Sequence, residues 1–281
     1  MTERVMQIRI GHSPDPDDAF LFYAMTSGRV PLSGFTVTHC MEGIEELNQR
    51  AMSGELEMTA ISLHAYPYVA DRYAVLTTGA SVGEGYGPVV VAKQPMSVEQ
   101  LKKSRIAVPG KLTTASLLLQ LAIGKADLQI MPFDQILEAV RDGKVPAGVL
   151  IHEGQITYRD SGLVKVIDLG EWWKQKTELP VPLGVNVVRR DLGPALLKNL
   201  AAAFKSSLDY AFAHRQEALD YAKQYGRGLS MPLTDRFVGM YVNRWSVDCR
   251  PDGAVAMQKL LDWAADEKLT PKKVRLEFVE A

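Results

Sequence analysis

One histidine stands where α/β proteins commonly place their chemistry. Small and apolar residues run from Ala147 to Ile151, as in a short strand buried on both faces, and His152 follows at once. Ligands of open α/β sheets bind at the carboxyl ends of strands, and imidazole exchanges a proton near neutral pH. The sequence therefore offers His152, flanked by Glu153, as a general base. The alternative is a strand-end histidine whose ring is capped by a backbone carbonyl.

Hydroxyl groups stand at two other predicted element boundaries. A strand over 105–108 and a tight turn lead to Thr113 and Thr114, which precede a helix predicted over 115–123. Free N–H groups at a helix start can receive a carboxylate or phosphate, but threonine there also serves as a plain N-cap, and both roles stay open. The turn lacks Walker-loop spacing, so nucleotide hydrolysis is not expected. Ser62 likewise follows a strand predicted over 56–61.

Three aspartates cluster around a proline near the N-terminus, at Asp15, Asp17 and Asp18. Proline followed by acidic residues is typical of the first turn of a helix, where carboxylates complement free N–H groups. A metal reading is the alternative, but the run lacks the spaced ligands of a calcium loop. We therefore expect helix capping and no metal.

The remaining candidates for chemistry are histidines and a tryptophan pair. His12 and His64 lie next to predicted strand ends and are candidates to line a cleft, whereas His39 and His214 are expected at the surface or at helix ends. The pair at 172–173 either covers an aromatic ligand or packs at a hinge between lobes.

The composition of the chain excludes several classes of function. The chain has 281 residues, of which 47% are hydrophobic and 23% charged, and its formal net charge is −1. This charge gives no general attraction to nucleic acid or anionic membranes, and we expect neither as a partner. No apolar run is long enough to span a membrane, and residues 1–10 do not read as a secretory signal. The isolated Cys40 and Cys249 indicate neither a disulfide framework nor a zinc site, and the cytoplasm is the expected compartment.

The order of predicted elements indicates how these residues are positioned. Strands alternate with helices through the first two thirds, and four helices follow, beginning near Pro194. This pattern predicts an α/β fold with partly parallel sheets. Changes in texture near residues 92 and 184 predict a smaller inserted lobe, 93–184, within a larger discontinuous lobe, 1–92 plus 185–281. A cleft between two such lobes suits a small-molecule ligand, and closure excludes water from it.

Several motifs in one order carry a family resemblance. They are Ser13-Pro14-x-Pro16-x-Asp18-x-Phe20, Gly110-x-x-Thr113-Thr114, Ile151-His152-Glu153, Thr157-Tyr158, Asp168-Leu169-Gly170-x-Trp172-Trp173, Pro182-Leu183-Gly184, Arg189-Arg190-Asp191-Leu192-Gly193 and Tyr241-Val242-Asn243. Together they resemble the 1,4-dihydroxy-6-naphthoate synthase family of the futalosine route to menaquinone, over roughly residues 7–250. The resemblance implies a two-lobed type II periplasmic-binding-protein-like fold with a central cleft and a helical C-terminal part.

The resemblance also implies an activity. A cofactor-free lyase would convert cyclic dehypoxanthinyl futalosine to 1,4-dihydroxy-6-naphthoate and release dihydroxyacetone. The family's proposed general base falls on His152, and its substrate-contacting threonines fall on Thr113 and Thr114. A further ligand segment, usually Lys-Leu-Ser, falls on Ala60-Ile61-Ser62.

This chain departs from the family pattern in two places. Ala60 stands where the lysine is usual, and Asp15-Pro16-Asp17-Asp18-Ala19 replaces Cys-Pro-Asn-Asp-Thr. Losing a cation near an anionic substrate weakens binding, and Lys111 is a candidate replacement. Two other functions remain as alternatives: a solute-binding protein for a small carboxylate, and chorismate dehydratase of the same pathway.

Overall fold

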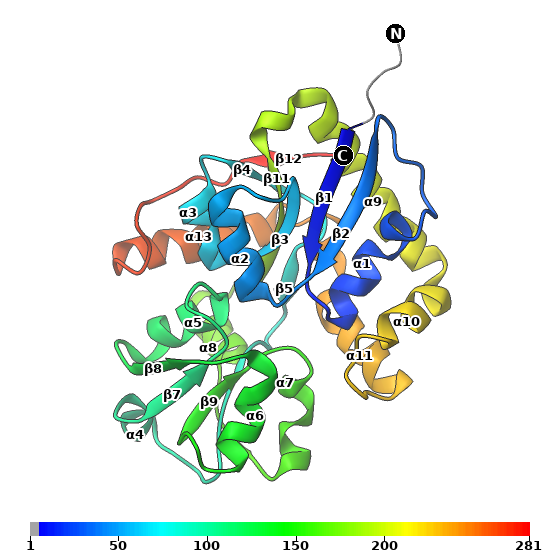
Figure 1. The fold of residues 1–281 in the computed structure, drawn as a ribbon. Helices are drawn as coiled ribbons and strands as arrows, with labels where there is room; N and C mark the ends of the chain where they lie inside the picture. The colour runs from blue at the N-terminus through cyan, green and yellow to red at the C-terminus, as the bar shows by residue number, and fades with distance from the viewer. Residues whose placement is uncertain (1–5) are drawn as a thin grey trace.

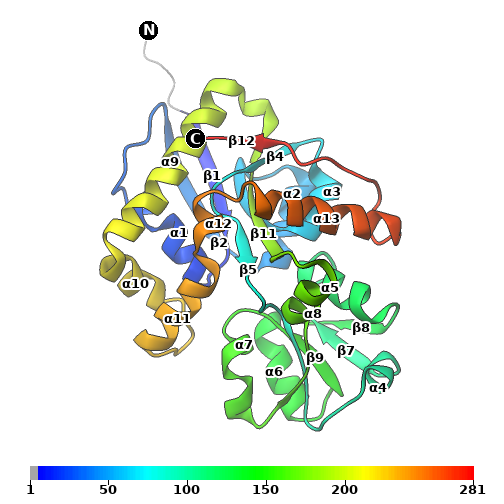
Figure 2. The ribbon, with the colours of Figure 1, turned by 180° about the vertical axis from the view of Figure 1, so that it is seen from behind.

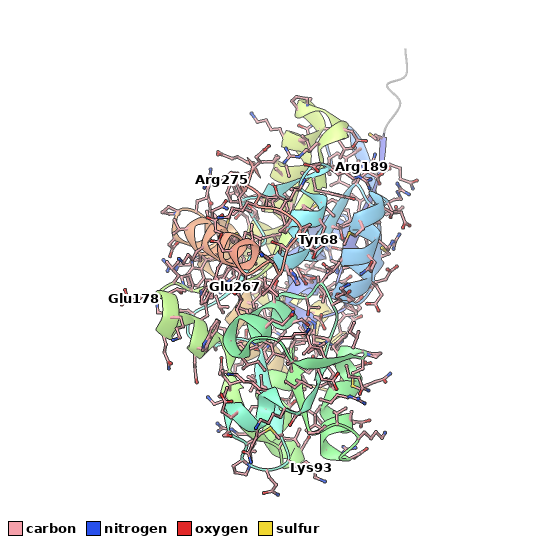
Figure 3. The ribbon with its side chains drawn as sticks, turned by 90° about the vertical axis from the view of Figure 1, so that its left-hand side faces the viewer. Tyr68, Lys93, Glu178, Arg189, Glu267 and Arg275 are labelled. Carbon is pink, nitrogen blue, oxygen red and sulfur yellow. The ribbon has the colours of Figure 1, made fainter. Side chains whose placement is uncertain are left out.

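The protein consists of two α/β lobes joined on one side. The computed structural model describes residues 6–281, and Figure 1 shows the larger lobe above the smaller one. In the side view of Figure 3, Lys93 lies in the smaller lobe, while Arg189 and Arg275 lie in the larger one. The predicted α/β class is confirmed. The prediction that residues 1–10 are not a secretory signal concerns, in its first five residues, positions outside the described part of the chain.

The larger lobe is built on a seven-stranded sheet of order β12-β4-β11-β3-β1-β2, with β5 paired to β11. Its strands are β1 (Met6–His12), β2 (Phe35–Met41), β3 (Met58–Ser62), β4 (Tyr73–Leu76), β5 (Ser81–Gly83), β11 (Val181–Arg189) and β12 (Phe278–Val279). The strands β1, β2 and β3 are parallel, whereas β11 runs antiparallel to β3. The carboxyl ends of β1 and β3 therefore meet at one edge, and this edge faces the other lobe (Figure 1).

The smaller lobe has a five-stranded sheet of order β10-β6-β9-β7-β8. Its strands are β6 (Val89–Ala92), β7 (Arg105–Val108), β8 (Asp127–Ile130), β9 (Ala147–Leu150) and β10 (Val164–Asp168). Its helices are α4 (Val98–Lys102), α5 (Thr114–Ile123), α6 (Phe133–Arg141), α7 (Gly154–Thr157) and α8 (Leu169–Thr177), with a 3₁₀ turn η2 (Tyr158–Ser161). The strand β9 is wholly buried, as its small apolar residues predicted.

The helices of the larger lobe flank its sheet, and the C-terminal helical block is seen from behind in Figure 2. They are α1 (Pro16–Thr26), α2 (Ile44–Ser53), α3 (Tyr66–Val69), α9 (Pro194–Ala213), α10 (Arg215–Lys223), α11 (Met231–Tyr241), α12 (Arg244–Val247) and α13 (Asp252–Asp266), with 3₁₀ turns η1 (Leu63–Ala65) and η3 (Arg190–Leu192). Phe22 of α1 stacks against Phe204 of α9, with ring centroids 4.6 Å apart. The predicted start of α1 at Pro16 is confirmed.

The chain crosses between the two sheets twice. It leaves the larger sheet between β5 and β6 and returns between β10 and β11. The valines of β6 pair with β9 and β10 inside the smaller sheet, although residues 89–92 were assigned to the larger lobe. The return strand begins at Val181 and includes Pro182. The proline is tolerated there because the pairing of β11 with β5 is irregular at this point. The lobe boundaries at 92/93 and 184/185 stay a prediction.

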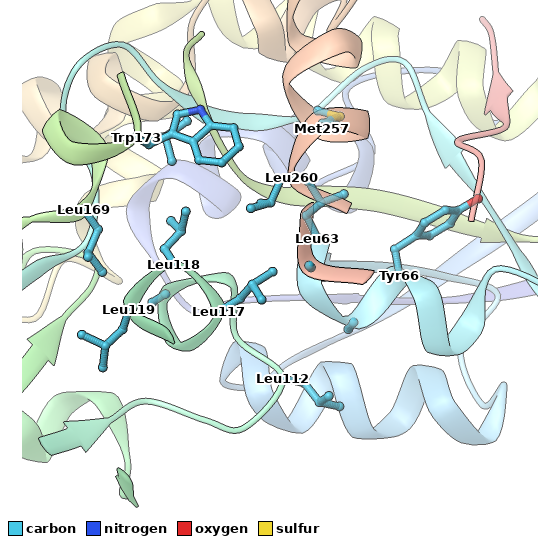
Figure 4. Packing of buried hydrophobic residues seen from close by; sticks show 14 of the residues in the cluster. Leu63, Tyr66, Leu112, Leu117, Leu118, Leu119, Leu169, Trp173, Met257 and Leu260 are labelled. Atoms are coloured by element: carbon cyan, nitrogen blue, oxygen red, sulfur yellow. The ribbon is translucent and has the colours of Figure 1, made fainter. Parts of the chain in front are cut away.

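An apolar cluster crosses from one lobe to the other. Leucines of α5 and Trp173 of α8 belong to the same buried cluster as Leu63 and the α13 residues Met257 and Leu260 (Figure 4). The indole of Trp173 donates a hydrogen bond to the Pro180 carbonyl at 2.9 Å. Both indoles of the 172–173 pair pack near Trp263 of α13, at 5.7 and 5.9 Å. Of the two readings of this pair, the structure supports packing between the lobes.

Within residues 6–281, no helix has the length and apolar character needed to cross a membrane.

Candidate active site

A cavity between the lobes contains all six predicted site residues in its lining. It comprises about 690 Å³ of space between the atoms, part of it open to solvent. The six are Ala60, Ile61, Ser62, Thr113, Thr114 and His152. They come from three segments: the end of β3, the start of α5 and the turn after β9.

His152 is held in an uncommon backbone conformation. Its φ is 53°, in the left-handed region that costs a non-glycine residue on the order of 1 kcal/mol. The turn ends β9 and points the imidazole into the cavity, where the side chain is 15% exposed. Its Nε2 atom is buried and makes no hydrogen bond within the described residues. His152 thus belongs to the cavity lining and has one ring nitrogen without a partner among the described residues.

The other ring nitrogen of His152 faces a carboxylate rather than a backbone carbonyl. Its Nδ1 lies 3.1 Å from Oδ2 of Asp15, which is fully buried at the loop before α1. The contact has hydrogen-bonding distance without hydrogen-bonding alignment, which is common in unliganded active sites. The edge of the His152 ring also packs on Phe133, with centroids 4.7 Å apart. Capping by a carbonyl, the alternative reading of this histidine, is not what the structure contains.

Arg227 completes the surroundings of this pair. Its guanidinium contacts Asp15, donates to the Pro14 carbonyl at 3.0 Å and pairs with Oε2 of Glu153 at 2.9 Å. It also lies over the Phe133 ring, 4.7 Å from the centroid. Two carboxylates and one aromatic face therefore surround a single guanidinium.

A glutamine fixes the turn that carries His152. With its amide nitrogen toward the Tyr241 hydroxyl (2.5 Å) and the Gly87 carbonyl (2.7 Å), Gln155 accepts a hydrogen bond from the backbone N–H of His152 at 3.1 Å. Burial raises the pKa of Tyr241 well above its ordinary value, so the hydroxyl keeps its proton. This network links α7 to α11 and supports the left-handed backbone of His152.

Two further carboxylates line the cavity at the start of α1. Asp18 accepts a hydrogen bond from the backbone N–H of Ser13 at 2.8 Å, and burial raises its pKa to about 6. Burial, together with the charges of Asp18 and Asp15, raises the pKa of Asp17 well above its ordinary value. Oδ1 of Asp17 makes no hydrogen bond within the described residues. The protonated form of Asp17 can therefore donate a hydrogen bond to a ligand.

The threonine hydroxyls at the start of α5 are already used by the protein. Thr113 Oγ1 donates to the Gly110 carbonyl at 3.0 Å and caps α5 by accepting from the Ser116 N–H. Thr114 Oγ1 donates to the Leu183 carbonyl at 2.6 Å and accepts from the His64 N–H at 3.2 Å. Because a hydroxyl has one proton, neither side chain retains a donor for a ligand. The N–H groups of the first helical turn have no intrahelical partner and remain the donors here.

The end of β3 contributes one free donor and one methyl group. Ser62 Oγ accepts a hydrogen bond from the Asn48 amide at 3.2 Å, which leaves its own proton available. Ala60 lies opposite Asn186 of β11 in the sheet register. The amide nitrogen of Asn186 donates to the Gly79 carbonyl at 2.8 Å, while its buried Oδ1 makes no hydrogen bond within the described residues and lines the cavity. Ser62 and Asn186 thus add one donor and one acceptor to the residues that line the cavity.

Other sequence candidates lie away from the cavity. His12 is fully buried and contacts the Ser13 carbonyl at 2.9 Å and His39 at 3.2 Å. His64 is buried against the Thr113 carbonyl at 3.2 Å, so it supports α5 rather than lining the cavity. His39 and His214 are exposed, as predicted. Lys111 is exposed and does not line the cavity, so the replacement cation considered for it is not found there.

Sequence reasoning missed two important neighbours of His152. Asp15 was assigned to helix capping, yet its side chain makes no capping hydrogen bond. Arg227 was not singled out, although it stands alone between Gly226 and Gly228, an arrangement typical of a loop that presents one side chain. Asn186 was also missed, because an asparagine within a valine-rich strand gives no further signal.

Comparisons with known proteins agree over nearly the whole chain. A family described as menaquinone biosynthesis matches residues 8–266. A 1,4-dihydroxy-6-naphthoate synthase of Thermus thermophilus is 42% identical over 97% of this chain and 99% of its own length. The enzyme of the same name from Streptomyces coelicolor is 37% identical over 94% of this chain and 95% of its own length.

Solved structures agree with the two-lobed fold. A protein of Archaeoglobus fulgidus superposes with a TM-score of 0.90 at 48% identity, covering 94% of this chain and 98% of that one. An alkanesulfonate-binding protein of Xanthomonas axonopodis superposes with a TM-score of 0.71 at 16% identity, covering the full length of both chains. This second likeness concerns the fold alone and confirms the periplasmic-binding-protein-like architecture.

Proposed function

The chain belongs to the menaquinone-biosynthesis family, and from this premise we propose that it is a 1,4-dihydroxy-6-naphthoate synthase in which His152 is the general base. It is an enzyme of menaquinone biosynthesis acting on a small molecule. In the proposed reaction, a carbon–carbon lyase converts cyclic dehypoxanthinyl futalosine to 1,4-dihydroxy-6-naphthoate and releases dihydroxyacetone. No cofactor takes part in this proposal.

The observation that carries the proposal is the state of the His152 ring. His152 lines the cavity, its Nε2 makes no hydrogen bond within the described residues, and its Nδ1 faces the Asp15 carboxylate at 3.1 Å. A neutral imidazole with its proton on Nδ1 presents an acceptor at Nε2, as a general base requires. Such a base removes a proton from a carbon made acidic by a neighbouring carbonyl, and bond cleavage and aromatisation follow.

Polar groups around the base are suited to the charges of this reaction. The first-turn N–H groups of α5, at Thr114 and Ala115, are placed to hold a carboxylate or a developing oxyanion. Asp17 in its protonated form is placed to donate a hydrogen bond to a carbonyl oxygen that gains negative charge. The Ser62 hydroxyl and Asn186 Oδ1 are placed to orient the polyol part. Ala60 supplies no charge, so binding of the anion depends on N–H groups.

A product assay with cyclic dehypoxanthinyl futalosine tests the proposal. The variant His152→Asn should lower kcat by about 10²–10⁴-fold, the usual contribution of a general base, without lowering the melting temperature. The variant His214→Asn serves as the matched control, since His214 is half exposed and outside the cavity. Turnover of His152→Asn at the wild-type rate would remove His152 from the mechanism.

The same assay separates the two alternative functions. A solute-binding protein would return the cyclic futalosine unchanged, and a chorismate dehydratase would instead form 3-enolpyruvylbenzoate from chorismate. Neither outcome is expected, because a ligand carrier has no need of an unpartnered base held in a strained turn.

A further inference from the structure

The side-chain contacts that residues 152–155 make with Asp15, Arg227 and Tyr241 cross from one lobe to the other. His152 and Glu153 lie in the turn between β9 and α7 of the smaller lobe, Gln155 lies in α7, and these three partners belong to the larger lobe. Asp15 precedes α1, Arg227 lies between α10 and α11, and Tyr241 ends α11. Figures 1 and 2 show α7 and α11 approaching one another from opposite lobes. The surroundings of the base are therefore complete only when the lobes are together.

The two lobes are held differently on the two sides of the cavity. On one side, α5 and α8 pack on α13 through the buried apolar cluster (Figure 4). On the other side, the contacts of residues 152–155 with the larger lobe are polar and partly exposed: Arg227 is 30% exposed and Glu153 18%. Apolar packing of this kind is dense and retains its geometry, whereas exposed ion pairs contribute little net free energy and are readily exchanged for water. Opening of the lobes would thus separate the polar side.

We propose that Asp15 and Arg227 are positioning residues for His152, supplied by the opposite lobe, so that lobe closure completes the general base. This inference rests on the proposed function of His152. Asp15 Oδ2 is placed to accept a hydrogen bond from the Nδ1 proton, which fixes the tautomer that leaves Nε2 free. Arg227 pairs with Asp15 of the larger lobe and Glu153 of the smaller lobe at the same time, and so stabilises the closed arrangement of the lobes.

Arg227 also removes an electrostatic obstacle to this arrangement. Asp15 is fully buried and Glu153 is 18% exposed, and both would otherwise place negative charge beside the cavity. A guanidinium between two carboxylates, stacked on Phe133, offsets both charges and forms hydrogen bonds in fixed directions. In the open arrangement, Asp15 would lose its contact to His152, and the imidazole could carry its proton on either nitrogen.

Two variants test the positioning of His152 by kinetics. Asp15→Asn should lower kcat about 10²-fold with KM within about threefold of wild type, because the substrate does not contact Asp15. Arg227→Gln should raise KM and lower kcat together, since it weakens closure. The matched control is Arg215→Gln: Arg215 also pairs with an aspartate (Asp235) and lies over a phenylalanine ring (Phe20), but wholly within the larger lobe. It should retain wild-type kinetics, and all variants should retain their melting temperatures within a few degrees.

A scattering measurement tests closure without any substrate. The radius of gyration of substrate-free Arg227→Gln, from small-angle X-ray scattering, should exceed that of wild type and of Arg215→Gln. An unchanged radius together with unchanged kcat in Asp15→Asn would overturn the inference while leaving the role of His152 intact. If wild type makes no product, the proposed function fails, and the scattering comparison alone then decides whether Arg227 holds the lobes together.

Discussion

Replacing His12 by asparagine should change how the stability of this protein depends on pH. His12 is fully buried, stacked on Phe22 with centroids 4.7 Å apart, and its Nδ1 lies 2.9 Å from the Ser13 carbonyl. Burial lowers the pKa of His12 from 6.5 to about 4, with a smaller contribution from the neighbouring His39. The folded state therefore resists a proton that the unfolded chain accepts.

The sign and size of the effect follow from this lowered pKa. His12 leaves stability unaffected above pH 6.5, and stability is lost as the pH falls from 6.5 to about 4. The difference of about 2.5 pKa units corresponds to about 3 kcal/mol of unfolding free energy. Asp18, whose pKa is raised to about 6, acts in the opposite direction, because its contribution rises as the pH falls from about 6 to 3.8. The pH dependence of wild-type stability alone would therefore combine the contributions of His12 and Asp18.

Urea unfolding of wild type and His12→Asn between pH 4 and 7.5 isolates the contribution of His12. Asparagine retains a donor for the Ser13 carbonyl but does not titrate, so its packing cost should be the same at every pH. The stability advantage of wild type over the variant should shrink by about 3 kcal/mol between pH 7.5 and 4. A difference that stays constant across this range would refute the buried, uncharged His12. The variant His214→Asn, altered at an exposed histidine outside the core, is the matched control.

Two other substitutions test side chains at the cavity wall. Thr113→Ala should lower the unfolding free energy by about 1–2 kcal/mol, because the N-cap of α5 is lost. The unfolding free energy of Thr113→Ser should stay close to that of wild type. Equal stability of the two variants in urea unfolding would contradict the capping role. Asp17→Asn should be more stable than wild type at pH 7.5, with the gain disappearing toward pH 4 and with reduced kcat; a gain that is independent of pH would contradict the raised pKa of Asp17.

The parts of the site that the sequence predicted correctly are those signalled locally. A short apolar run followed by a polar residue is sufficient to place His152 at a strand end, and β9 ends just before it. A strand, a turn and two threonines likewise predicted the start of α5. The choice between capping and ligand binding by Thr113 could not be made, because it depends on where one hydroxyl proton goes, and its acceptor is the Gly110 carbonyl.

The residues that were missed depend on contacts between distant segments. Asp15 looks like a helix-start carboxylate, and only the fold brings it to His152 from the other lobe. Arg227 is conspicuous between two glycines, but its partners Asp15 and Glu153 lie far from it in the sequence. The two-residue strand β12 is too short for any alternation to reveal it. Pairing across a cleft has no period in the sequence, so local patterns cannot predict it.

The apolar cluster shared by α5, α8 and α13 has a consequence for folding. Leu117, Leu118 and Trp173 are fully buried in a cluster that also contains residues of the other lobe, such as Leu260. A fragment comprising the smaller sheet and its helices would expose these side chains to water, at a cost of about 1.5–3 kcal/mol for each. The two lobes are consequently not separable folding units: they share one core, and heat or denaturant should melt them in a single cooperative transition.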